Sequence, residues 1–172
     1  MIEFILGGAR SGKSQFAEQR AHDSGKSCIY IATAQAGDSE MAARIQLHRE
    51  QRSGFARTVE EPIALAQIIA DNMDDSRCLL IDCLTLWLTN LLLADSPDTF
   101  AYERAQLLDV LQQVRGRIIF VSNEVGQGVV PMDALSRRFV DESGRLHQAL
   151  AQLSTRTFFV TAGLPQLLKG TM

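Results

Sequence analysis

The segment Gly-Gly-Ala-Arg-Ser-Gly-Lys-Ser at residues 7–14 constrains the fold of this chain more than any other part of its sequence. It matches the pattern G-x-x-x-x-G-K-[ST] at every fixed position, between a short apolar run and a segment with helical spacing. In such a loop the glycines let consecutive backbone N–H groups turn inward, and the positive end of the following helix points at the same place. The sequence therefore predicts a phosphate-binding loop between a buried strand and a helix.

Individual residues of this motif have expected roles in nucleotide binding. We expect Lys13 to neutralise the β- and γ-phosphates and the Ser14 hydroxyl to bind Mg²⁺. Asp82 ends a later apolar run, where a carboxylate reaches the same metal ion directly or through water. The alternative role for Asp82 is to cap the helix that begins at Leu84. The nucleotide-binding residues predicted in the loop are Gly7, Gly8, Ala9, Arg10, Ser11, Gly12, Lys13 and Ser14.

Apolar runs of strand length alternate with segments of helical periodicity along the rest of the chain. Strands are expected at residues 2–6, 28–32, 78–81, 118–121 and 157–161, and helices at 13–22, 39–51, 62–70, 84–93, 98–114 and 131–153. This alternation is typical of a mainly parallel sheet with helices on both faces. With 172 residues and no linker or repeat, the chain is predicted to form a single α/β domain of the P-loop (RecA-like) type over residues 1–172.

Composition and charge argue against several function classes. The formal charge of -3, from 17 basic and 20 acidic residues, provides no broad basic surface, so we expect no nucleic-acid partner. The longest apolar stretch, residues 84–94, is interrupted by polar residues and is shorter than the roughly 20 residues of a membrane span. Cys28, Cys78 and Cys83 lack paired metal spacing and are expected as small core residues. An odd cysteine count without a leader sequence favours a cytoplasmic protein.

A histidine lies among arginines in the predicted helix at 39–51. Arg44, His48 and Arg52 are spaced by four residues and would share one face of that helix. The neighbouring positive charges would hold a polyphosphate and keep the imidazole neutral and nucleophilic. The alternative from residue types alone is a solvated helix face that carries a surface histidine.

Several separated blocks of the sequence resemble one enzyme family. These blocks are GGARSGKS, YIATAQAGDSEMAARIQLHREQR, TVEEP, IDCLTLWLTNLL, NEVGQGVVPMDALSRRFVDESGRLHQALA and VTAGLPQLLK, and the similarity covers residues 2–169. They resemble the bifunctional adenosylcobinamide kinase and adenosylcobinamide-phosphate guanylyltransferase family of cobalamin biosynthesis. The resemblance implies phosphorylation of adenosylcobinamide by ATP or GTP, followed by transfer of GMP from GTP to give adenosylcobinamide-GDP.

The resemblance also implies roles for particular residues. His48 matches the histidine that carries GMP covalently in this family, which makes His48 and Lys13 the expected catalytic residues. Glu60 matches a carboxylate that contacts the nucleotide. The other positions implied for the nucleotide pocket are Thr33, Ala34, Gln35, Arg49, Glu50, Gln51, Arg52 and Asp82. Asn123 and Glu124 form either a tight turn or a contact with substrate or nucleotide. The expected cofactor is Mg²⁺, and the expected assembly is a homotrimer.

Three positions depart from the family pattern. Ala56 stands where a tryptophan is frequent, Ser53 where a proline is common, and His147 where an asparagine is usual. Two other functions stay open at this point. One is a single-function P-loop kinase that acts on another small alcohol. The other is a nucleotide-driven nucleic-acid motor, which the modest charge disfavours.

Overall fold

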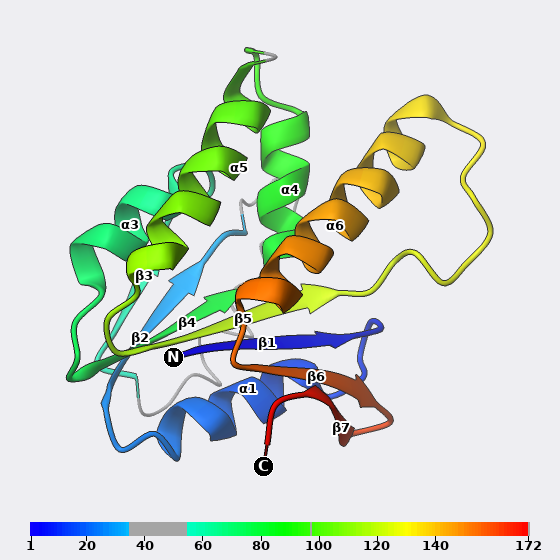
Figure 1. Ribbon diagram of the computed structural model, residues 1–172. Helices are drawn as coiled ribbons and strands as arrows, with labels where there is room; N and C mark the ends of the chain where they lie inside the picture. The colour runs from blue at the N-terminus through cyan, green and yellow to red at the C-terminus, as the bar shows by residue number, and fades with distance from the viewer. Residues whose placement is uncertain (35–54, 97, 172) are drawn as a thin grey trace.

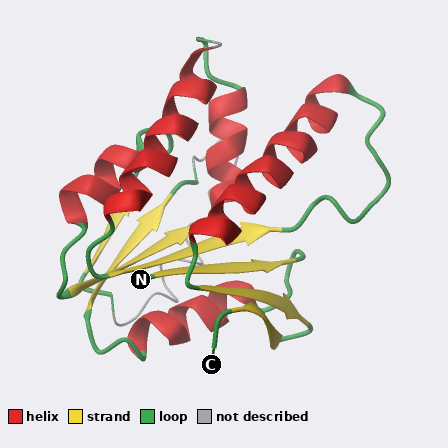
Figure 2. Ribbon diagram, in the orientation of Figure 1, coloured by secondary structure: helices red, strands yellow, loops and turns green. Residues whose placement is uncertain are grey.

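The computed structural model describes residues 1–34, 55–96 and 98–171, and these form a single layered α/β arrangement. The strands of its seven-stranded sheet lie in the order β3-β2-β4-β5-β1-β6-β7. Every neighbouring pair is parallel except β6 and β7, which are antiparallel. Helix α1 covers one face of the sheet, and α3, α4, α5 and α6 cover the other (Figures 1 and 2). The predicted mainly parallel α/β class is confirmed.

The elements have the following bounds. The strands are β1 (Ile2–Gly7), β2 (Ser27–Ala32), β3 (Arg57–Glu60), β4 (Arg77–Asp82), β5 (Arg117–Asn123), β6 (Arg156–Thr161) and β7 (Leu164–Lys169). The helices are α1 (Lys13–His22), α3 (Leu65–Asn72), α4 (Leu84–Leu92), α5 (Asp98–Val110) and α6 (Ala134–Leu153), with a 3₁₀ turn at Leu111–Gln113. In this described part of the chain, none of the helices combines the length and apolarity that crossing a bilayer requires.

Side chains of the central strands alternate between two apolar layers, as the two-residue period of a strand requires. The layer against α3–α6 contains Phe4, Ile31, Ile81 and Phe120. The layer against α1 contains Ile5, Tyr30, Leu80 and Val121. All three cysteines are buried, as expected, and burial raises the pKa of the Cys83 thiol to about 11. Because both faces of the sheet are covered, its inner strands are continuous apolar runs, which is why the sequence identified them.

Two strands are absent from the sequence-based expectations. β3 has four residues, mostly exposed, and therefore lacks the apolar run that marks the inner strands. β7 carries Pro165 and lies at the sheet edge, where the missing proline N–H costs no ladder hydrogen bond. Both strands therefore form because they pair with a neighbouring strand, β2 or β6, and local composition does not indicate such pairing.

Two helices begin later than expected. α3 begins at Leu65 rather than at residue 62, because the Glu61 carboxylate first accepts the N–H groups of Ile63 and Ala64 at 2.9 and 2.8 Å. α6 begins after Asp133 rather than at residue 131, because the Asp133 side chain caps it by accepting the Ser136 N–H at 2.8 Å. The helix expected at 39–51 lies outside the described residues.

A buried ion cluster joins three strands and one helix near the amino end of β1. The fully buried Glu3 carboxylate accepts hydrogen bonds from Arg20 of α1 at 2.7 and 3.0 Å and from Arg117 of β5 at 2.7 Å. Arg156 of β6 also reaches it, at 3.2 Å. Burial disfavours the ionised carboxylate, but the arginines outweigh burial and lower the pKa of Glu3.

Glu3→Gln is expected to lower the free energy of unfolding by about 3–5 kcal/mol at pH 7, because it leaves the buried guanidinium of Arg117 and two partly buried ones without their counter-charge. Since the folded pKa of Glu3 lies below its ordinary value of 4.5, this stabilisation is present above that value and is lost as pH falls through the folded pKa. Urea unfolding should therefore show that the difference in the free energy of unfolding between Glu3→Gln and wild type becomes smaller at acid pH. The control is Glu142→Gln, whose partner Arg145 is exposed, and it should cost less than about 1 kcal/mol. A difference in the free energy of unfolding that does not change with pH would contradict the role of the Glu3 charge.

Candidate phosphate-binding site

The predicted phosphate loop joins β1 to α1 at the carboxyl end of the parallel strands. Two left-handed residues shape it, Arg10 with a φ of 54° and Gly12 with a φ of 93°. The Phe16 N–H donates to the Gly12 carbonyl at 3.0 Å as α1 begins. No side chain in the described parts of the chain caps α1, and its first turn contains no acidic residue. No acidic side chain of its own first turn therefore offsets the positive end of the helix, which suits the binding of an anion.

The loop is held from both sides by segments that are distant in sequence. Directly after β5, the Glu124 N–H donates to the Gly7 carbonyl at 3.0 Å. In the turn between β6 and β7, the Gly163 N–H donates to the Ser11 carbonyl at 2.8 Å. That turn has two left-handed residues, Ala162 and Gly163, as two-residue hairpin turns commonly do. The sequence did not predict either hydrogen bond, because no local pattern indicates contacts between segments so far apart in the chain.

Gly7 and Gly8 form a matched pair for testing the packing of the loop. A Cβ added at Gly7 would lie 2.5 Å from both the Ser11 Oγ and the Val160 carbonyl oxygen, whereas one added at Gly8 would meet nothing within 4 Å. We expect Gly7→Ala to lower the free energy of unfolding of the ligand-free protein by about 1–3 kcal/mol, as overpacking does. Gly8→Ala should change it by less than about 0.5 kcal/mol. Urea unfolding followed by circular dichroism measures both, and equal losses would mean that packing does not distinguish the two positions.

Lys13 is the buried cation of the loop. The residue is 8% exposed, and its Nζ donates to the Gly8 carbonyl at 3.1 Å. Burial lowers the pKa of the Lys13 ammonium, while the nearby Asp82 carboxylate acts in the opposite direction. Lys13 is therefore a cation in partly desolvated surroundings, where its attraction to an anionic phosphate is stronger than in water.

Asp82 ends β4 beside this loop and does not cap the next helix. α4 follows Cys83, and no side chain in the described residues caps it. The Asp82 Oδ2 accepts a hydrogen bond from the Tyr30 hydroxyl at 2.8 Å, and its charge acts on Lys13. Mg²⁺ prefers oxygen ligands and commonly takes one or two from the protein, the rest being phosphate and water. Asp82 and Ser14 fit that pattern. Within residues 1–34, 55–96 and 98–171, no three His, Cys, Asp or Glu side chains gather to hold a metal.

Thr33 and Glu60 lie at the carboxyl ends of β2 and β3. Thr33 is fully buried, and its hydroxyl donates to the Cys83 carbonyl at 2.7 Å and accepts the Cys83 N–H at 3.0 Å. This side chain therefore ties the end of β2 to the end of β4. Glu60 is exposed and Ala34 is half-buried, and nucleotide contact by these three residues stays a prediction. The other predicted pocket residues, Gln35, His48, Arg49, Glu50, Gln51 and Arg52, lie outside the described residues.

Asn90, which the sequence analysis did not single out, connects two segments of the predicted pocket. From α4, its amide donates to the carbonyls of Thr33 at 2.8 Å and Pro62 at 3.1 Å. One turn earlier, the Trp87 Nε1 donates to the Ile63 carbonyl at 2.8 Å. α4 therefore holds the segments that follow β2 and β3. In the sequence, this role of Asn90 is indicated by nothing more than one amide side chain within the apolar run TLWLTNLL.

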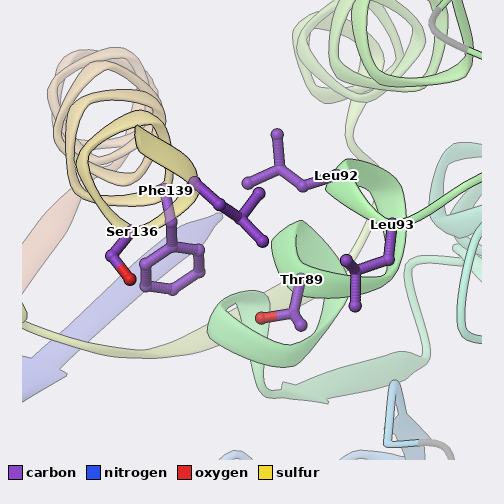
Figure 3. Close-up of a pocket in the computed structure, with 6 residues that line it drawn as sticks. Thr89, Leu92, Leu93, Ser136 and Phe139 are labelled. Atoms are coloured by element: carbon purple, nitrogen blue, oxygen red, sulfur yellow. The ribbon is translucent and has the colours of Figure 1, made fainter. Parts of the chain in front are cut away.

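A separate apolar pocket lies between α4 and α6, and Figure 3 shows the side chains that face it. It is lined by Thr89, Leu92, Leu93, Leu135, Ser136 and Phe139. Its volume of about 190 Å³ is below the roughly 300–1,000 Å³ of pockets that enclose small molecules. No residue of the phosphate loop lines it, so the edge of the sheet that carries the loop is the better candidate site.

Comparison with known proteins assigns the chain to a family. Residues 3–168 match the family described as Cobinamide kinase / cobinamide phosphate guanyltransferase. The chain belongs to this family. It is 58% identical over 170 residues to the bifunctional adenosylcobalamin biosynthesis protein CobP of Pseudomonas aeruginosa, with 99% of this chain and 98% of that protein covered. It is 37% identical over 177 residues to the bifunctional adenosylcobalamin biosynthesis protein CobU of Escherichia coli, with 95% and 97% covered.

These matches confirm the resemblance seen in the sequence and its coverage of nearly the whole chain. A solved structure from Pyrococcus horikoshii OT3 shares the fold of this cobinamide kinase family member, with a TM-score of 0.51 and 12% identity. The match covers 99% of this chain and 87% of that one, and at this identity it supports the fold alone.

Proposed function

We propose that this protein phosphorylates adenosylcobinamide with ATP or GTP and then transfers GMP from GTP to the phosphorylated product. The observation that carries the proposal is the phosphate loop with its buried Lys13, in a chain whose family is described by both activities. In the first reaction the loop amides and Lys13 hold the β- and γ-phosphates. In phosphoryl transfer the protein has little covalent chemistry to carry out. Positioning and charge stabilisation are therefore its main contributions.

Mg²⁺ is the proposed cofactor, with the Ser14 hydroxyl and the Asp82 carboxylate as its protein ligands. When bound, the ion would neutralise charge on the triphosphate in both reactions. The position of Asp82 at the end of β4 supports this role, because its charge already acts on Lys13 of the loop. The Tyr30 hydroxyl, which donates to Asp82 Oδ2, would fix the orientation of the carboxylate.

We assign the transfer of GMP to His48, through a covalent intermediate. The imidazole nitrogen would attack the α-phosphorus of GTP as pyrophosphate leaves, and a phosphate oxygen of adenosylcobinamide phosphate would then displace the histidine. The chain has three histidines. His22 ends α1, roughly 14 Å along the helix axis from Lys13, and His147 is buried with its Nε2 2.8 Å from Ser122 Oγ. Neither is an exposed nucleophile beside the loop, which favours His48.

Two labelling assays test the proposed function. Adenosylcobinamide should acquire phosphate from γ-labelled ATP or GTP, and adenosylcobinamide phosphate should acquire GMP from α-labelled GTP. Before the acceptor is added, the protein itself should carry α-label that is labile in acid and stable in alkali. Phosphorylation of a different small alcohol, with no covalent label and no reaction of adenosylcobinamide, would favour the single-function kinase. Nucleic-acid-stimulated hydrolysis would favour the motor.

The assembly of the protein is proposed from the family resemblance, and its location from the odd cysteine count. We propose a homotrimer in the cytoplasm. Light scattering over a range of protein concentrations measures the assembly, and a mass that stays at that of one 19.0 kDa chain would contradict the trimer.

A further inference from the structure

Glu124 is an acidic residue whose backbone contacts the phosphate loop. β1, which leads into the loop, is flanked in the sheet by β5 and β6. Glu124 directly follows β5, and its N–H reaches the Gly7 carbonyl at 3.0 Å, whereas β6 ends at Thr161 and continues into Ala162. Of the two strands that flank β1, only β5 is followed by an acidic residue. Asp82 lies one strand farther away, at the end of β4.

The Glu124 side chain is held in place and still reaches solvent. Its Oε1 accepts the Gly126 N–H at 2.6 Å, which gives the tight turn that was one of the two expectations for this segment. Its Oε2 lies 3.7 Å from the His147 Nδ1, and the side chain is 21% exposed. A carboxylate that is hydrogen-bonded at Oε1, lies beside an imidazole at Oε2 and is open to solvent is suited to exchange a proton with a bound substrate.

His147 of α6 is buried behind this carboxylate. Its Nε2 lies 2.8 Å from the Ser122 Oγ and 3.3 Å from the Ser143 Oγ, and its ring packs against Phe4 with centroids 5.4 Å apart. Burial lowers the pKa of the imidazole, with Glu124 opposing that shift, so the ring is neutral at pH 7. A neutral ring with its proton on Nδ1 points that donor at Glu124 and accepts a serine hydroxyl at Nε2.

We propose that Glu124 is the general base of the phosphorylation step and that His147 is the residue that positions it. This assignment rests on the proposed kinase activity. The substrate hydroxyl oxygen forms a bond to the γ-phosphorus as the bond from that phosphorus to the β–γ bridging oxygen breaks. The nucleoside diphosphate leaves with the bonding electron pair, and the hydroxyl proton moves to the Glu124 carboxylate. An acidic side chain that accepts the proton of the attacking hydroxyl has the same role in protein kinases.

Transfer of GMP does not require Glu124 to accept a proton. Its acceptor is a phosphate monoester, which is largely ionised at pH 7 and attacks without first losing a proton. The two reactions should therefore respond differently when Glu124 can no longer accept a proton. GMP transfer also serves as an internal control for folding and nucleotide binding in the same preparation.

Glu124→Gln tests the general base. Glutamine keeps the shape of the side chain and an oxygen for the Gly126 N–H, but it does not take up a proton at neutral pH. We expect the kcat of adenosylcobinamide phosphorylation to fall by about 10²–10⁴-fold. GMP transfer to supplied adenosylcobinamide phosphate should stay within about threefold of wild type. Unchanged phosphorylation, or equal loss of both reactions, overturns the assignment. A wild-type protein that does not phosphorylate adenosylcobinamide overturns the proposed function as well.

His147→Gln tests positioning, because the glutamine amide can replace Nε2 beside the two serines but leaves no donor at the place of Nδ1. Phosphorylation should lose about 10–100-fold in kcat with little change in nucleotide KM, as expected when a catalytic group is misplaced by about 1 Å. Ser143→Ala is the matched control, since it contacts the same imidazole at Nε2 and not Glu124, and should stay within about threefold. In the Glu124→Gln background, His147→Gln should cost nothing further. Independent, additive losses would overturn the positioning role.

Discussion

Replacing Lys13 with alanine is expected to lower both adenosylcobinamide phosphorylation and GMP transfer by about 10²–10³-fold in kcat, the usual cost of removing one group that stabilises transition-state charge. Both reactions should suffer because we propose that each uses a triphosphate held in this loop. The effect should be large because the ammonium is buried and beside the loop amides, where its attraction to phosphate is little screened. Steady-state assays of each reaction, with nucleotide varied, measure it.

The control for Lys13→Ala is Lys26→Ala. Lys26 precedes β2 at the amino end of the sheet, and its Nζ contacts the Asp75 carbonyl, so it carries the same charge away from the loop. Both activities of Lys26→Ala should stay near those of wild type. Lys13→Met, which keeps much of the buried side-chain volume, should resemble Lys13→Ala in activity. Near-normal activity in Lys13→Met would show that volume, rather than charge, accounts for the loss.

His48→Ala is expected to abolish transfer of GMP and the covalent label while leaving phosphorylation of adenosylcobinamide measurable. The expected loss in GMP transfer is on the order of 10⁶-fold, comparable to the removal of the nucleophile from a covalent enzyme. Phosphorylation survives because the substrate hydroxyl attacks the γ-phosphorus directly and needs no protein adduct. Label from α-labelled GTP, followed by digestion and identification of the modified peptide, measures the first effect.

The other two histidines provide the controls for His48→Ala. His22→Ala should retain the label and both activities, because His22 lies at the far end of α1 from the loop. His147→Gln should retain the label and lose about 10–100-fold in phosphorylation, which is the reverse of His48→Ala. Equal loss of both reactions in a folded His48→Ala protein would contradict this division, and label retained in it would place the adduct on another residue.

The inner strands and the phosphate loop could be predicted because their signals are local. β1, β4 and β5 are apolar on both faces, and the loop motif brings its own glycines and lysine. β3 and β7 were missed because they depend on pairing with β2 and β6 rather than on their own composition. The bond between Gly163 and Ser11 is of the same kind, since each partner is an ordinary loop residue until the fold brings them together.

The candidate site was predictable to a similar extent. Lys13 and Asp82 were located from the motif and from the end of an apolar run, and the structure places Asp82 close enough for its charge to act on Lys13. Thr33 was expected at the nucleotide, yet its hydroxyl is engaged with Cys83, because buried hydroxyl groups need partners that a sequence does not show. His147 was noticed only as a departure from a family pattern, and its contact with Glu124 required the packing of α6 against β5 and β1.

The hydrogen bond from Gly163 to Ser11 has a consequence for how the protein is made. The loop residues are translated before the hairpin that secures them. A nascent or prematurely terminated chain would thus contain every residue of the nucleotide motif and still lack one of the two supports that shape it. We therefore expect fragments that stop before β6 to bind triphosphates less tightly than the intact chain.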